Sequence, residues 1–174
     1  MNYKTKDLIM ASFFLALGLI IPYFFHILGM AGIIFLPMHI PVLLCGFILG
    51  SRYGLIVGLI TPLLSSVLTG MPPVYPVAIA MAFELATYGF ISGYLYKYKG
   101  LDIIPSLICA MLLGRAVSGI INYILITFGG HKFVLKMFLT SAFVTSIWGI
   151  LIQLILIPII IRTIKNTERT NIHG

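Results

Sequence analysis

The sequence has little charge and little of the chemistry that enzymes need. Charged residues make up 9% of its 174 residues, and Asp and Glu together number 4 against 11 Lys and Arg. Its 2 cysteines, Cys45 and Cys109, lie in apolar runs without metal-ligand spacing, so we expect them to be inert. The chain lacks a P-loop lysine motif, a nucleophile elbow and a His-Glu zinc helix. We therefore expect no enzyme, no cofactor, no metal site and no energy source within this chain.

Apolar residues dominate what is present. They make up 60% of the chain, and the mean hydropathy is +1.13. One soluble core of this size cannot bury so much apolar surface, so lipid must act as the solvent. Runs of near or above the ~20 residues that a spanning helix needs lie at Leu8–Leu28, Val77–Tyr96, Ile103–Phe128 and Phe138–Ile161. The sequence therefore predicts an all-α, multi-pass membrane protein.

Two shorter apolar runs make the span count ambiguous. Ile33–Leu49 and Leu55–Leu68 contain prolines and are separated by a turn-like segment at residues 50–54, so they form either two short spans or a re-entrant hairpin. The first run of the chain follows Lys4 and Lys6 but is too long for a signal peptide, so we expect it to stay as the first helix. With both short runs crossing, residues 1–174 form a single domain, a bundle of six transmembrane helices.

The basic residues predict the orientation of this bundle. With six spans, one side carries Lys4, Lys6, Arg52, Lys97, Lys99, Arg162, Lys165 and Arg169. The other side carries Lys132 and Lys136, and Arg115 lies inside a span. The positive-inside rule then places both termini in the cytoplasm. Topology and anionic lipid explain the net charge of +7, so no nucleic-acid partner is required.

Two ionisable residues, Glu84 and Arg115, lie inside the long apolar runs. A charge at the centre of a bilayer costs at least ~2.5–3.5 kcal/mol, so such residues face a protein interior or a polar cavity. One interpretation is a structural ion pair that joins the fourth and fifth predicted helices. The other is a ligand contact, since the arginine fork suits carboxylates. Either role satisfies the energetic argument.

Further polar and aromatic residues share helix faces with these two charges. Met81, Glu84 and Tyr88 share one face of the fourth predicted helix. On the fifth, one face carries Arg115, Ser118, Gly119 and Asn122, and on the sixth, one face carries Ser141, Thr145 and Trp148. Three helices can thus converge on a half-polar site, with Trp148, Tyr88 and Tyr123 as stacking surfaces. His39, near the outer surface, is a lid residue or an interface residue.

The outward connections predict a roof over this site. They are Gly29–Leu36, Gly70–Pro76 and Gly129–Lys136, and the first two are rich in Gly and Pro. Because proline fixes φ and removes a donor, we expect ordered lids rather than loose tethers, although each proline can simply end a helix. Small residues four apart, among them Ser12 and Ala16 in the first run, also suit close helix contact. That pair is a candidate docking surface for another membrane subunit.

Several stretches resemble a known family. They are FLPMHIPVLLCGFILG at residues 35–50, GLIVG at 54–58, TPLLSSVLTGMPP at 61–73, AFELATYGF at 82–90 and GRA at 114–116. Together they resemble the substrate-binding S component of energy-coupling factor vitamin transporters. The resemblance implies a six-helix protein of the bacterial plasma membrane that captures a vitamin outside and presents it to a transmembrane coupling subunit and two ATPase subunits. It also implies a pocket among the fourth to sixth helices and docking through small residues of the first helix, where Ser12 replaces the usual alanine.

The vitamin itself is not specified by the resemblance. Arg115 favours a small carboxylate such as nicotinate or pantothenate, whereas Trp148 and the tyrosines also suit a flat heterocycle. We expect Glu84, Tyr88, Arg115, Asn122, Trp148 and His39 to bind the ligand. Residues 29–39 and 70–76 are expected to cover the bound ligand until the partner subunits drive its release. Release then occurs either by rigid reorientation of the whole chain or by motion of these lids. The rival hypotheses are a small channel, which conducts without partners, and a membrane scaffold, which binds no small molecule.

Overall fold

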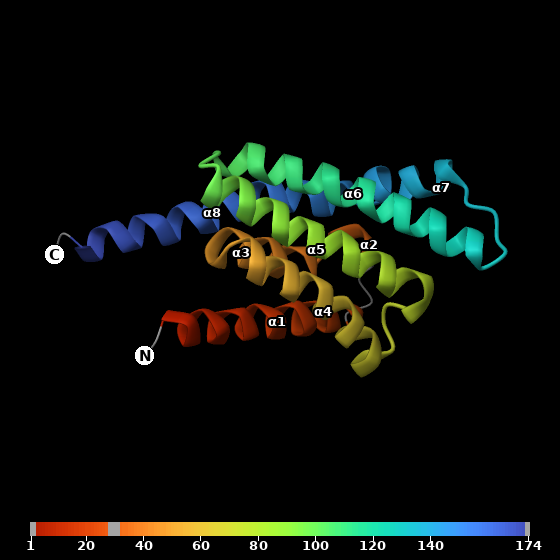
Figure 1. Ribbon diagram of the computed structural model, residues 1–174, viewed down its shortest axis with the longest axis horizontal. Helices are drawn as coiled ribbons and strands as arrows, with labels where there is room; N and C mark the ends of the chain where they lie inside the picture. Colours follow the sequence, from red (N-terminus) through yellow and green to blue (C-terminus); the bar gives the residue numbers. More distant parts are fainter. Residues whose placement is uncertain (1–2, 28–31, 173–174) are drawn as a thin grey trace.

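The computed structural model describes residues 3–27 and 32–172, and every element in them is helical (Figure 1). The elements are α1 (Tyr3–Ile27), α2 (Gly32–Phe35), α3 (His39–Leu49), α4 (Ser51–Thr69), η1 (Val74–Ala78), α5 (Ile79–Gly93), η2 (Tyr94–Tyr98), α6 (Ile103–Phe128), α7 (Leu135–Leu139), η3 (Thr140–Thr145) and α8 (Ile147–Ile172). The predicted all-α class is therefore confirmed.

The described helices include 5 that are long and apolar enough to cross a membrane: Thr5–Phe25, Ser51–Thr69, Val74–Tyr98, Ile103–Phe128 and Ile147–Thr167. The short run predicted at residues 33–49 is divided into α2, a non-helical link and α3. At 11 residues, α3 is about 16 Å long, roughly half the thickness of a bilayer core. The count of six spans thus stays a prediction.

The chain turns sharply at Gly50, where we predicted a longer turn over residues 50–54. Gly50 has φ 100°, which only glycine adopts readily, and α4 begins at the next residue. Gly54 lies inside α4 for a different reason. Its Cα faces the backbone of Gly89 in α5, and a Cβ on either glycine would collide with the backbone of the opposite helix. The small-residue seams of α3, α4 and α5 are therefore filled within this chain.

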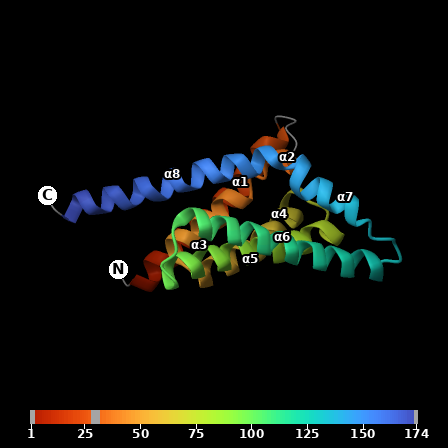
Figure 2. The same cartoon turned by 90° about the horizontal axis from the view of Figure 1, so that it is seen from above.

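The final helical region is bent rather than continuous. We predicted one helix over Phe138–Ile161, but α7 and the π-helical η3 lead to a break at Ser146, whose φ and ψ are −91° and 14°. The Ser146 hydroxyl donates to the Ala142 carbonyl oxygen at 2.6 Å, a bond that commonly bends helices. The bend turns α7 and η3 toward α6, while α8 runs back over α3 (Figure 2).

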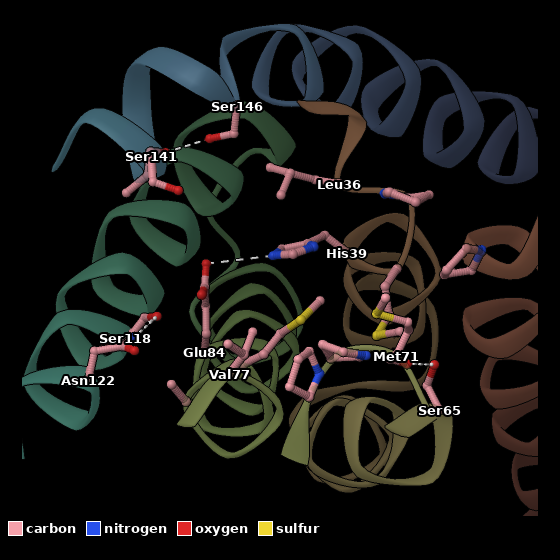
Figure 3. Close-up of a pocket in the computed structure, with 18 of the residues that line it drawn as sticks. Leu36, His39, Ser65, Met71, Val77, Glu84, Ser118, Asn122, Ser141 and Ser146 are labelled. Atoms are coloured by element: carbon pink, nitrogen blue, oxygen red, sulfur yellow. Dashed lines mark hydrogen bonds and ion pairs between the residues drawn. The ribbon is translucent and has the colours of Figure 1, made fainter. Parts of the chain in front are cut away.

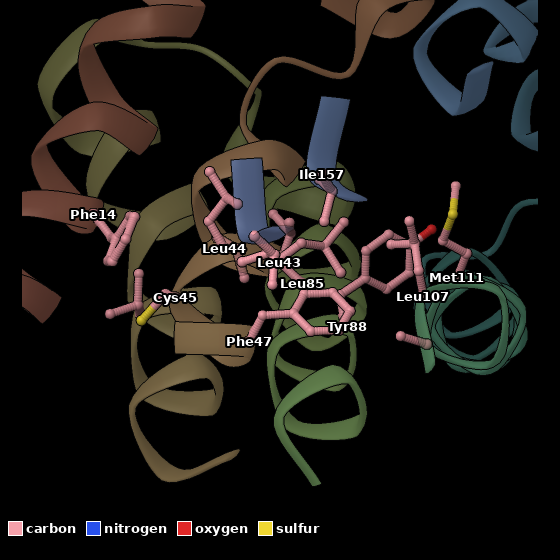
Figure 4. Packing of buried hydrophobic residues seen from close by; sticks show 14 of the residues in the cluster. Phe14, Leu43, Leu44, Cys45, Phe47, Leu85, Tyr88, Leu107, Met111 and Ile157 are labelled. Carbon is pink, nitrogen blue, oxygen red and sulfur yellow. The ribbon is translucent and has the colours of Figure 1, made fainter. Parts of the chain in front are cut away.

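The apolar core lies where α3, α5, α6 and α8 meet (Figure 4). Leu43, Leu85, Tyr88, Leu107 and Ile157 are all fully buried there. Outward-facing positions are also apolar, for example Leu112 in α6 and Ile155 in α8, whose side chains are 56% and 63% exposed. Apolar side chains on both the inside and the outside of a bundle suit lipid as the surrounding solvent.

The connections gather at two opposite ends of the bundle (Figure 1). The first turn of α1, the last turn of α8, and the α3–α4 and α5–α6 connections lie at one end. The α4–α5 and α6–α7 connections lie at the other end. Residues of the α4–α5 loop, at the second end, line the candidate site.

Candidate functional site

Close packing of α5 on α6 brings the two buried charges together. Gly114 faces the ring of Tyr88, and a Cβ there would overlap the ring atoms, so the two helices approach closely at this level. Arg115 follows Gly114, and Glu84 lies one turn from Tyr88 on the same face of α5. Their residues are 9% and 5% exposed, so water screens the pair little.

The charges form an ion pair that other segments support. Arg115 Nη1 lies 2.9 Å from Glu84 Oε1, and His39 Nε2 lies 3.6 Å from the same oxygen. Arg115 Nη2 also donates to Ser146 Oγ at 3.4 Å. One cluster thus connects α3, α5, α6 and the bend before α8. The structural ion pair suggested by the sequence is present, and its members also face a cavity.

The cavity has a volume of about 570 Å³ (Figure 3), and the α4–α5 loop at the end opposite the termini forms part of its wall. Its walls come from α1, the α2–α3 link, the start of α3, α4, the α4–α5 loop, η1, α5, α6, α7, η3 and Ser146. The lining residues are Pro22, Tyr23, Leu36, Pro37, Met38, His39, Ser65, Thr69, Met71, Pro72, Pro73, Val77, Ala80, Met81, Glu84, Arg115, Ser118, Asn122, Phe138, Ser141, Ala142 and Ser146. A cavity of this size suits a small organic molecule.

The lining has a polar side and an apolar side. Ser118 and Asn122 follow Arg115 along α6, and Ser141 faces them from η3 (Figure 3). Asn122 Nδ2 donates to the Ser118 carbonyl oxygen at 2.9 Å and lies 3.4 Å from its hydroxyl. Methionines and Phe138 supply apolar surface elsewhere in the cavity. This combination can orient a polar group while covering an apolar body.

Hydroxyl groups of α4 hold the α4–α5 loop over the cavity. Ser65 Oγ donates to the Met71 carbonyl oxygen at 2.8 Å, and Ser66 Oγ donates to the Pro72 carbonyl oxygen at 2.6 Å. At its far end, the Tyr75 hydroxyl donates to the Leu125 carbonyl oxygen of α6. The loop therefore has fixed contacts on both sides, as its prolines predicted.

The other two outward connections contribute differently. Residues 36–39 of the first predicted lid line the cavity, whereas residues 29–31 of it lie outside the described part of the chain. From the third connection, residues 129–136, no residue is among those that line this cavity in the described chain. The roof is thus formed by the α2–α3 link, the α4–α5 loop and the α7–η3 segment.

Four of the six predicted ligand residues lie together: Glu84, Arg115, Asn122 and His39 all line the cavity. Tyr88 does not line it. Its ring is fully buried one turn below Glu84, 5.3 Å from the His39 ring between centroids. Trp148 lies outside the cavity, with 61% of the residue exposed on α8.

The sequence did not indicate Ser65, Thr69 or Ser146 as site residues. For Ser65 and Thr69, which lie near the end of α4, the sequence did contain a signal. Hydroxyl residues in the last turn of a helix before a Gly-Met-Pro-Pro loop can hydrogen-bond to that loop and hold it. For Ser146, no helical periodicity of the sequence could have indicated that the side chain faces the site. The π-helical turn shifts the helix face, so that Ser146 is 1% exposed and points inward, while Thr145 is exposed.

The arrangement can bind a small molecule through the polar side of its lining. Within residues 3–27 and 32–172, no three His, Cys, Asp or Glu side chains lie close enough together to hold a metal ion. Ser65 and Ser146 donate to backbone carbonyl oxygens, and Ser146 also accepts from Arg115. A cavity lined by hydrogen-bonding groups and apolar surface can recognise a small molecule.

Comparison with known proteins agrees with this geometry. The family model described as the substrate-specific component of ECF transporters matches residues 6–161. No curated protein and no solved structure matches the chain. The matched region spans α1 to α8 and includes every residue that lines the cavity.

Proposed function

Because the chain belongs to the family of substrate-specific components of ECF transporters, we propose that it captures a vitamin or vitamin precursor outside the cell for ATP-driven uptake. The observation that carries the proposal is the cavity, which combines an enclosed polar cluster with apolar walls. The α4–α5 loop, which lies at the end opposite the termini, forms part of the cavity wall. A binding site near that end of the bundle suits the capture step of an importer.

The partners in this proposal are a transmembrane coupling subunit and two ATPase subunits. The sequence has no P-loop lysine motif, so the energy for release has to come from other chains. We place the protein in the bacterial plasma membrane with both termini in the cytoplasm. The concentration of Lys and Arg at the end that holds the termini supports this orientation. Residues 32–49, α2 and α3 together, provide the sixth crossing.

The exposed face of α1 is the proposed docking surface for the coupling subunit. Ser12 and Ala16 lie one turn apart on this face, and both are exposed, whereas Phe14 packs inward. Two small residues one turn apart allow a partner helix to approach closely. The Ser12 hydroxyl bonds within its own helix, to the Leu8 carbonyl oxygen at 3.0 Å, so it does not impede an apolar contact.

Replacement of Ala16 by tryptophan tests this surface. We expect Ala16→Trp to reduce uptake with the coupling module by about tenfold or more, corresponding to ~1.4 kcal/mol of docking free energy, without changing ligand affinity. Ile155→Trp, on the exposed face of α8, is the control and should leave uptake unchanged. Equal uptake by the two variants would place the docking surface elsewhere.

The proposed function is tested by comparing binding with transport in liposomes. The isolated chain should bind a vitamin tightly, while sustained uptake should require the coupling and ATPase subunits together with ATP. Flux through the chain alone would instead indicate a channel. No small-molecule binding would indicate a scaffold, although the glycine seams available for partner helices are already filled within the chain.

A further inference from the structure

The charges at the cavity wall cancel one another. Arg115 and Glu84 are paired at 2.9 Å, and the same carboxylate oxygen lies 3.6 Å from His39 Nε2. An imidazole is ordinarily neutral above pH 7. The three side chains then carry a net charge of zero, so the charge of each ionised group is already compensated by its partner.

The remaining cavity wall adds no charge. Glu84 and Arg115 are the charged side chains among the described lining residues, and the other polar ones are Tyr23, Ser65, Thr69, Ser118, Asn122, Ser141 and Ser146, besides His39. Hydroxyl and amide groups donate and accept hydrogen bonds without compensating a full charge. The wall can therefore recognise polar groups on a ligand but has no spare countercharge for an ion.

A charged ligand would leave one charge without a partner inside the bundle. An anion would compete with Glu84 for the single positive charge of Arg115, and a cation would compete with Arg115 for the single negative charge of Glu84. Arg115 Nε has no hydrogen-bond partner among the described residues, so Arg115 can still donate to an uncharged ligand while it stays paired. Arg115 is also held by its contact with Ser146 Oγ at 3.4 Å. Buried charges are tolerated in a low-dielectric site mainly as pairs, so either exchange is unfavourable.

We propose that the cavity selects a ligand without net charge, with amide, hydroxyl or ring-nitrogen groups, against ionised analogues of the same size. This inference rests on the proposed function, since it specifies the substrate class of the same site. The polar edge of the ligand faces Ser118, Asn122 and Ser141, and its body lies against the methionines and Phe138. This uncharged ligand class takes the place of the small carboxylate that we inferred from Arg115 in the sequence.

Matched pairs of compounds test the selection at pH 7.5. The probes are nicotinamide with nicotinate, and pantothenol with pantothenate, measured by calorimetry on the purified chain in detergent. Any compound that co-purifies with the chain is added to this panel. We expect the uncharged member of a bound pair to bind at least about tenfold more tightly than the ionised member. Equal or tighter binding of the ionised member would overturn the inference.

A charge substitution makes the test independent of the particular ligand. Glu84→Gln keeps the size of the side chain but leaves Arg115 without a countercharge, so the preference should shift toward the anionic member by about tenfold or more. Asp102→Asn is the control, because it removes a carboxylate charge at an exposed position that does not line the cavity, and it should leave the preference ratio unaltered. The double variant Glu84→Gln/Arg115→Gln restores neutrality and should restore the original preference. An unaltered ratio in Glu84→Gln would contradict the inference.

The outcomes separate the two proposals. If no member of the panel binds and no compound co-purifies, the proposed function fails and the inference fails with it. If a compound binds and carries a net charge, the protein is still a binding subunit, and the selection for uncharged ligands alone is overturned.

Discussion

Arg115→Met is expected to destabilise the protein by about 3–5 kcal/mol, because it leaves the Glu84 carboxylate without a countercharge at a buried position. The magnitude follows from burial. The side chains of Arg115 and Glu84 are 10% and 6% exposed, so solvent cannot replace the lost partner. Thermal or denaturant unfolding of the purified protein in detergent measures the loss, provided that the variant unfolds reversibly.

A double variant provides the control for this prediction. Glu84→Gln/Arg115→Met has no buried charge left to stabilise, so it should recover most of the stability that the single variant loses. If Arg115→Met were as stable as the unaltered protein, water or another group would have to compensate Glu84, and the ion pair would not hold α5 to α6.

Gly89→Ala is expected to cost about 3 kcal/mol or more, although alanine is the better helix former by ~1 kcal/mol. The Cβ of an alanine at position 89 would lie within the backbone of Gly54, and backbone atoms cannot rotate away as a side-chain end can. Helices α4 and α5 would have to separate along their length. Size-exclusion chromatography and thermal unfolding of the purified variant measure the effect.

Gly119→Ala is the matched control for this substitution. The nearest atom to its new Cβ would be a ring carbon of Phe138, 3.0 Å away, and a side chain can shift by the required few tenths of an ångström. We expect this variant to fold with nearly unchanged stability. Equal stability of the two variants would contradict the close backbone contact between α4 and α5.

The sequence predicted the positions of the long helices well, because hydropathy directly reflects the lipid solvent. The run at Ile103–Phe128 coincides with α6 at both ends. Glu84, Arg115 and Asn122 line one cavity, as expected because polar residues in apolar helices must face one another or a cavity, and His39 lines it too. That these residues bind a ligand stays a prediction. The same argument could not choose between ion pair and ligand contact, and the structure contains the pair within the cavity wall.

The parts that sequence reasoning missed depend on departures from regular helix geometry. The π-helical η3 and the bend at Ser146 rotate the last helices, so that Trp148 faces outward and Ser146 faces the cavity. A prediction based on the 3.6-residue period of a regular α-helix cannot detect such an insertion. Tyr88 shares a face with Glu84 as predicted, yet the packing of its ring against Gly114 places it below the cavity. That outcome depends on the spacing of α5 and α6, which one sequence does not specify.

The most direct test of the account is native mass spectrometry of the chain purified from cells grown in rich medium. We expect a fraction of the protein to carry one small vitamin-like molecule, and we expect the Arg115→Met variant to lose it. A chain that carries nothing, and that also binds no compound of the vitamin panel, would contradict its assignment as the substrate-binding subunit of an importer.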